Sequence, residues 1–258
     1  MNLRKGDYVT RNSYKNDTVF KVINRKKDVL YLKGVEYRLL ADADVNDCVL
    51  IDPKLLPEEF KPVDNDNIDE RNEYFYLPGK ILHLDGDAEY LNRCMNYYKK
   101  NKVLAIGKVI NEKTLPNEIR DLLNDTKPDI VIITGHDYLK KNSSKKDINN
   151  YENSINFVKA VKEARKYEKS HDKLVIIAGA CQSDYEELIK AGSNFASSPA
   201  RVNIHALDPA IIAVNVATTN RNTEIDLLDL LGKTKNGADG MGGLITKGTM
   251  FVGYPRWV

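Results

Sequence analysis

A histidine and a cysteine follow two apolar runs of this sequence, and together they could act as a base and a nucleophile. Residues 129–137 read DIVIITGHD and end with His136 and Asp137, and residues 173–183 read KLVIIAGACQS and contain Cys181. An imidazole can take the proton of a thiol, and the resulting thiolate attacks a carbonyl carbon. These residue types at these positions predict a cysteine peptidase.

Both runs are rich in β-branched residues, which is typical of strands buried on both faces of a parallel sheet. Catalytic groups of such sheets gather beyond the carboxyl ends of the strands. Cys181 comes 45 positions after His136, and one right-handed crossover is expected to join the two strands. We therefore expect neighbouring strand ends, with His136 as the base and Cys181 as the nucleophile.

The other three histidines fit the role of base less well. His205 also follows an apolar segment and is the rival base. His83 is expected inside a strand as a structural residue, and His171 in a charged, solvated loop.

The chain has three cysteines, Cys48, Cys94 and Cys181, an odd number without close spacing. This pattern favours free thiols in a reducing compartment over a disulfide framework or a zinc site. A helix predicted directly after Cys181 would place that thiol at the positive end of the helix dipole, which stabilises a thiolate. Cys48 and Cys94 lack this setting, so we expect both to be packing residues.

From residue 76 onward, predicted strands and helices alternate, which indicates a doubly wound, mostly parallel α/β sandwich of the flavodoxin-like or caspase-like kind. The expected strands are 81–84, 103–110, the two runs above and a fifth strand-helix step over 194–219. The expected helices are 88–100, 115–124, 150–168 and 227–233, followed by a glycine-rich stretch and an edge strand over 248–253.

Two shorter segments precede this domain, which we place at residues 76–258. Short alternating runs at hairpin spacing over residues 1–52 predict a small SH3-like or Tudor-like β-barrel. Residues 53–75 contain three prolines and a stretch of Asp, Asn and Glu, and we expect them to be a linker because they bury too little apolar surface to order.

Composition fits a globular enzyme and argues against several other classes. The chain of 258 residues is 42% hydrophobic and carries a net charge of only +2, so we expect neither nucleic acid nor a membrane surface as a partner. Its apolar runs are far shorter than the roughly 20 residues that cross a bilayer. The first residues do not resemble a signal peptide, so a cytosolic protein is expected. The thiol and the imidazole need no metal and no cofactor.

Chain order helps to choose among cysteine hydrolases. A glutamine amidotransferase also has its cysteine at a strand-to-helix turn, but its histidine comes well downstream. Histidine at one strand end and cysteine about 45 residues later instead resembles the caspase, gingipain and legumain clan.

That clan has a glycine directly after the histidine, whereas this chain has Gly135 before His136 and Asp137 after it. In the clan, the main-chain N–H groups of the glycine and of the cysteine form the oxyanion hole. The resemblance implies that Asp137 and Cys181 supply these groups here. Alternatively, the Asp137 carboxylate orients the imidazole.

A closer resemblance covers nearly the whole chain. Residues 81–87 (ILHLDGD), 133–137 (ITGHD), 178–183 (AGACQS) and 194–209 (NFASSPARVNIHALDP), with 6–9 and 39–44 near the start, together resemble the YabG sporulation peptidases. The resemblance implies a protease of the mother-cell cytoplasm that becomes associated with the spore coat. Its expected partners are protein substrates, the coat and cortex-associated proteins, cleaved next to arginine.

A substrate arginine needs a carboxylate in the S1 pocket, because a desolvated guanidinium must be paired. We favour Asp85, which follows the first strand, with Asp87 and Asp208 as the other candidates. Ser197 and Ser198 could line the pocket. The ordinary reading is that Asp-Gly-Asp forms a turn and a helix cap, and that the two serines form a turn.

Arg71 lies in the acidic linker and is the expected point of self-cleavage. Two other functions stay open at the level of sequence. One is an amidase that uses Cys181 with His205. The other is a spore-coat assembly protein without enzymatic activity, in which the cysteine is incidental.

Overall fold

The computed structural model describes residues 3–56 and 74–255. The chain divides into two compact units, residues 1–61 and 62–258. Arg71 lies outside the described residues, so the predicted self-cleavage point and the assignment of 53–75 as a linker stay predictions.

The first unit contains a five-stranded antiparallel sheet in the order β4-β3-β2-β1-β5. Alternating residues of its strands, such as Phe20, Val22, Leu30 and Leu32, point inward and form a small core of their own. The strands are β1 (Tyr8–Arg11), β2 (Phe20–Lys26), β3 (Val29–Gly34), β4 (Leu40–Asp44) and β5 (Cys48–Ile51). Short 3-10 helices cover Asn12–Tyr14, Val45–Asp47 and Pro53–Leu55.

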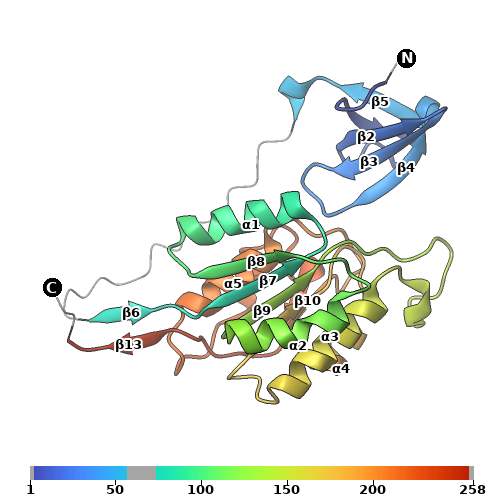
Figure 1. The fold of residues 1–258 in the computed structure, drawn as a ribbon. Helices are drawn as coiled ribbons and strands as arrows, with labels where there is room; N and C mark the ends of the chain where they lie inside the picture. Colours follow the sequence, from blue (N-terminus) through green and yellow to red (C-terminus); the bar gives the residue numbers. More distant parts are fainter. Residues whose placement is uncertain (1–2, 57–73, 256–258) are drawn as a thin grey trace. The chain divides into compact units, whose positions relative to one another are not determined.

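The second unit is built on a six-stranded sheet in the order β12-β11-β10-β9-β7-β8 (Figure 1). Five of these strands are parallel, and β12 runs antiparallel to β11. The strands are β7 (Ile81–Asp85), β8 (Ala105–Val109), β9 (Ile130–Thr134), β10 (Val175–Ala178), β11 (Phe195–Ser197) and β12 (Met241–Gly243). The predicted α/β class with a mostly parallel sheet is confirmed.

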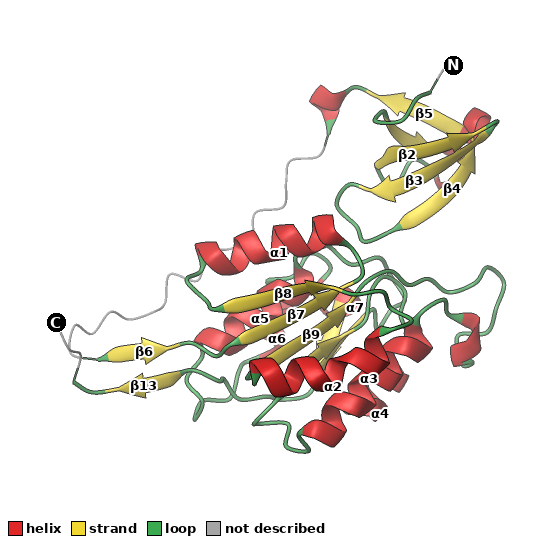
Figure 2. Ribbon diagram, viewed as in Figure 1, coloured by secondary structure: helices red, strands yellow, loops and turns green. Residues whose placement is uncertain are grey.

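Helices cover both faces of this sheet (Figures 1 and 2). One face carries α1 (Ala88–Lys100) and α5 (Asp208–Thr218), which contact each other, and the other carries α2 (Leu115–Thr126), α3 (Ser154–Tyr167) and α4 (Tyr185–Ala191). Every residue of β7, β9 and β10 is buried as a result. Burial on both faces explains why these strands read as unbroken apolar runs rather than as alternating ones.

Helix boundaries follow from local capping. Helix α1 spans the predicted residues because the Asp87 side chain accepts hydrogen bonds from the N–H groups of Glu89 and Tyr90 and fixes its start. Helix α3 begins at Ser154, four residues later than predicted, since Ile148–Asn150 forms a separate 3-10 turn.

No helix or strand was predicted for the glycine-rich stretch. It forms α7 (Gly237–Gly240) and strand β12, after α6 (Leu227–Gly232). A side chain at Gly243 would place its Cβ 2.5 Å from the carbonyl oxygen of Asn194, so glycine permits this close pairing of β12 with β11.

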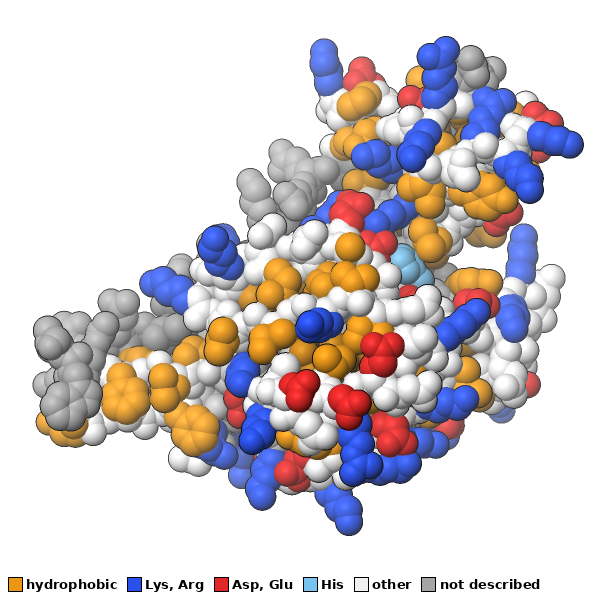
Figure 3. Space-filling view, viewed as in Figure 1, with side chains coloured by type: hydrophobic (Ala, Val, Ile, Leu, Met, Phe, Trp, Pro, Cys, Tyr) orange, Lys and Arg blue, Asp and Glu red, His pale blue; other side chains and the backbone are white. Residues whose placement is uncertain are grey.

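The last strand, β13 (Phe251–Gly253), is not an edge of the main sheet. It pairs with β6 (Phe75–Leu77) in a separate two-stranded ribbon. The edge strands of the main sheet are β12 and β8, and Figure 3 shows hydrophobic side chains at the surface near β8. Leu104 and Val109 are exposed there, with the charged Lys108 between them. Among the helices of the described residues, none is long and apolar enough to span a membrane.

Candidate active site

The pairing of β9 with β10 fixes where His136 and Cys181 leave the sheet. Ile133 pairs with Ala178, and the N–H of Gly179 donates to the Ile133 carbonyl at 3.0 Å. His136 and Cys181 each lie three residues beyond this pair. The predicted neighbouring strand ends are therefore present, at the same level of the carboxyl edge.

Cys181 lies in a tight turn and is fully buried. Its sulfur accepts a hydrogen bond from the N–H of Ile204 at 3.4 Å and donates to the Ile204 carbonyl at 3.8 Å. Next to it, Gln182 adopts a left-handed conformation, with φ of 57°, and its N–H donates to the Ser198 hydroxyl and to the Val202 carbonyl. The segment 202–204 thus covers the thiol.

The prediction that the dipole of the following helix stabilises the Cys181 thiolate is wrong. Helix α4 begins at Tyr185 with Asp184 as its N-cap, so Cys181 lies three residues before the cap. The field of a helix dipole falls off within the first turn.

His136 lies between two carboxylates. Its Nδ1 atom is 3.7 Å from Oε1 of Glu112, and its Nε2 atom is 3.7 Å from Oδ2 of Asp87. The Nε2 atom is buried and makes no hydrogen bond with any described residue, Cys181 included. The ring of Tyr90 lies 5.9 Å away between centroids. Each ring nitrogen of His136 therefore faces one carboxylate.

Glu112 is the residue that the sequence analysis missed. Its Oε1 atom also accepts a hydrogen bond from the main-chain N–H of His136 at 2.9 Å. Burial raises the pKa of Glu112, but the hydrogen bonds and charge of His136 outweigh it and lower the pKa below the ordinary value. The available signal was its place in the chain, because Glu112 follows strand β8 at the same edge of the sheet.

Asp137 ties the two strand ends together. Its carboxylate accepts hydrogen bonds from the Ser183 hydroxyl at 2.8 Å, the Ser154 hydroxyl at 2.5 Å and the N–H of Asn153 at 2.7 Å. Burial raises the pKa of Asp137, although these bonds oppose the shift. Ser183 belongs to the cysteine turn and Ser154 begins α3, so this carboxylate holds the turn in place, and the carboxylates beside the imidazole are Glu112 and Asp87.

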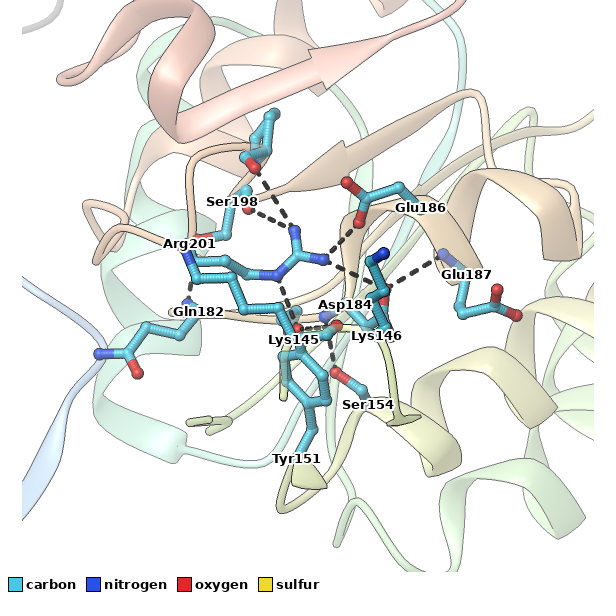
Figure 4. Close-up of polar contacts among 12 residues, drawn as sticks. Lys145, Lys146, Tyr151, Ser154, Gln182, Asp184, Glu186, Glu187, Ser198 and Arg201 are labelled. Carbon is cyan, nitrogen blue, oxygen red and sulfur yellow. Dashed lines mark hydrogen bonds and ion pairs between the residues drawn. The ribbon is translucent and has the colours of Figure 1, made fainter. Parts of the chain in front are cut away.

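A buried ion pair between Arg201 and Asp184 joins the loops around this edge (Figure 4). The Arg201 guanidinium donates to the Tyr151 hydroxyl at 2.7 Å, to Asp184 at 3.3 Å and to Glu186. It joins the loop before α3 to the start of α4 and to the turn after β11. Charge-assisted bonds of this kind are among the stronger polar contacts in proteins.

The three acidic candidates for an S1 pocket differ in accessibility. Asp85 is buried and accepts bonds from the Thr134 hydroxyl and from the N–H of Asp87, while His83 lies 3.4 Å away. Asp208 is buried and accepts bonds from the N–H groups of His205 and Lys235.

Asp87 caps α1 and keeps 15% of its side-chain surface exposed. It is thus the acidic candidate with the most accessible side chain.

The serines and the rival base are also buried. The Ser198 hydroxyl bonds within the turn, donating to the Val202 carbonyl, and the buried Ser197 hydroxyl makes no hydrogen bond with a described residue. Nδ1 of His205 accepts the N–H of Leu207 at 3.1 Å, so a neutral ring carries its proton on Nε2. That tautomer leaves His205 poorly arranged to take a proton from Cys181.

Comparison with known proteins gives the family. A family model described as YabG peptidase U57 matches residues 4–67 and 57–255. The chain is 39% identical over 286 residues to Sporulation-specific protease YabG of Bacillus subtilis (strain 168), with 99% of each protein covered. The chain belongs to the YabG peptidase family, and the predicted resemblance is confirmed. It is a sporulation protease and acts on protein substrates.

The space around Glu112 gives a first prediction. A Cβ at Gly135 would lie 2.4 Å from Oε1 of Glu112, whereas a Cβ at Gly232 would meet nothing within 4 Å. We expect Gly135→Ala to lower the free energy of unfolding by about 1–3 kcal/mol through overpacking. Gly232→Ala, the matched control, should leave it unchanged or raise it slightly. Urea unfolding of both variants measures the difference, and equal stability would contradict the packing described.

Proposed function

We propose that this chain is a cysteine endopeptidase in which Cys181 is the nucleophile and His136 its base. The observation that carries the proposal is the register of β9 and β10, since both residues follow the paired Ile133 and Ala178 by three positions. Nε2 of His136 makes no hydrogen bond with a described residue and faces the Asp87 carboxylate at 3.7 Å, which supports the role of base.

The proposed reaction follows the chemistry of thiol hydrolases. Nε2 of His136 takes the proton from Sγ of Cys181, and the thiolate attacks the carbonyl carbon of the scissile bond. The main-chain N–H groups of Asp137 and Cys181 stabilise the oxyanion. The imidazolium then protonates the leaving amine as the C–N bond breaks, and water hydrolyses the thioester.

Access to the sulfur requires a movement. Cys181 is fully buried, and its sulfur is hydrogen-bonded to the main chain of Ile204. The segment 202–204 must therefore move aside before a substrate carbonyl can reach the sulfur. Hydrogen bonds between catalytic groups are often long before substrate binds, which is consistent with the missing bond between Cys181 and His136.

Three single substitutions test the dyad with a peptide library as substrate. Cys181→Ala and His136→Ala should each reduce turnover by at least about 100-fold, since a general base alone contributes roughly 10²–10⁴-fold. His205→Ala should keep turnover if it keeps its fold, as judged by circular dichroism. Loss in His205→Ala together with full activity in His136→Ala would contradict the dyad and favour the amidase alternative.

The proposal also covers the fold types of the two units, the place of action in the cell and the substrates. We assign the six-stranded sheet with its two helix layers to the caspase-like sandwiches and the five-stranded sheet to the SH3-like barrels. The proposed place of action is the mother-cell cytoplasm and then the spore coat, with coat and cortex-associated proteins as substrates. Membership of a peptidase family speaks against the alternative of a coat-assembly role without catalysis.

We propose cleavage next to arginine, with Asp85, Asp87 and Asp208 as candidates for the S1 carboxylate. Asp87 is the best supported, because its side chain is partly exposed and lies beside His136. The two serines, Ser197 and Ser198, stay candidates for the pocket wall.

Asp87→Asn tests the S1 carboxylate while keeping the helix cap, since Asn and Asp cap helices equally well. The ratio of kcat/KM for Arg over Leu peptides should fall by at least about 30-fold, because an unpaired buried charge costs roughly 2–5 kcal/mol. Asp85→Asn serves as the comparison. If the ratio falls in Asp85→Asn and not in Asp87→Asn, the pocket belongs to Asp85 and our preference is wrong.

Self-cleavage at Arg71 is a separate part of the proposal. Intact-mass measurement of purified wild-type protein should show two fragments divided at Arg71, and Cys181→Ala should stay whole. Arg71→Gln should stay whole as well while still cleaving added peptide. A single intact mass for wild-type protein that cleaves peptide would contradict self-cleavage.

A further inference from the structure

We infer that Glu112 is a positioning residue for His136, so that the site is a triad of Cys181, His136 and Glu112 rather than a dyad. The inference rests on the proposed function of His136 as the base. It adds a role for a residue on the loop between β8 and α2, outside both strands that carry the dyad.

The contacts of Glu112 are directed at one residue. A single carboxylate oxygen, Oε1, accepts the main-chain N–H of His136 at 2.9 Å and lies 3.7 Å from its Nδ1 atom. Glu112 therefore holds both the backbone and the ring of the histidine. A carboxylate beside Nδ1 stabilises a proton on that nitrogen. Asp87 lies equally far from Nε2, so what distinguishes Glu112 is its additional bond to the main chain of His136.

The main chain beside Glu112 leaves room for its carboxylate. A Cβ at Gly86 would lie 2.1 Å from Oε1 of Glu112, and one at Gly135 would lie 2.4 Å from the same atom. These two glycines follow β7 and β9, which pair with each other in the sheet. The space that holds Glu112 thus depends on glycine at both strand ends.

The other acidic side chains near the His136 ring make different contacts. Asp87 faces Nε2 and uses its other oxygen to cap α1. Asp137 binds Ser154, Ser183 and main-chain N–H groups. Tyr90 packs its ring against the imidazole. Glu112 is the carboxylate that faces Nδ1 and also binds the main-chain N–H of His136.

The test compares Glu112→Gln, Glu112→Asp and Glu118→Gln. Gln keeps an oxygen for the His136 N–H but has no charge, Asp keeps the charge, and Glu118 is an exposed glutamate of α2 that serves as the matched control. We expect Glu112→Gln to lower kcat by about 10- to 100-fold with little change in KM, less than the roughly 10²–10⁴-fold of a base itself. Glu112→Asp should recover part of that loss.

The pH–rate profile separates positioning from a merely structural role. In Glu112→Gln, the limb that reports protonation of the imidazole should move to lower pH, because the imidazolium loses a neighbouring negative charge. Glu118→Gln should match wild type in kcat and in profile.

An unchanged kcat and profile in Glu112→Gln, with His136→Ala inactive, would overturn the triad and leave the dyad intact. Full activity of His136→Ala would overturn the proposed function itself. The two failures are therefore distinguishable in one series of variants.

Discussion

The parallel pairing of β9 with β10 is the constraint on which the site depends. Backbone hydrogen bonds set the register, and the register puts residues 136 and 181 at the same level of one edge. Beyond this edge, carboxylates hold the two loops in place, where backbone hydrogen bonds of the sheet no longer do so. Asp137 joins the cysteine turn to α3, and Glu112 joins the histidine to the loop after β8. A slip of either strand would separate all of these groups at once.

Much of the framework could be predicted because its signals are local. Continuous β-branched runs indicated the buried strands β9 and β10, and Asp87 before an amphipathic stretch indicated the start of α1. Chain order and loop length then indicated that the two strand ends are neighbours. The family could be predicted as well, since its motifs lie on the strand ends, where catalytic groups of an α/β sheet gather.

The rest depends on contacts between residues distant in sequence. Glu112 reads as an ordinary loop glutamate until the fold brings it to His136, 24 positions away. Asp137 reads as a partner for the imidazole, yet Ser154 and Ser183 bind its oxygens. The covering of Cys181 by Ile204 and the strand made by the glycine-rich stretch are equally non-local. Pattern and propensity carry no information about such pairings.

The rate at which an alkylating reagent labels Cys181 tests the central claim most directly. All three cysteines are buried, and burial raises the pKa of Cys48, so Cys48 in a strand and Cys94 in a helix serve as internal references outside the proposed dyad. With iodoacetamide at neutral pH and mass mapping, wild-type Cys181 should react faster than both, and His136→Ala should remove most of that advantage. Equal, slow labelling of all three cysteines, unchanged in His136→Ala, would contradict a thiol activated by the neighbouring histidine.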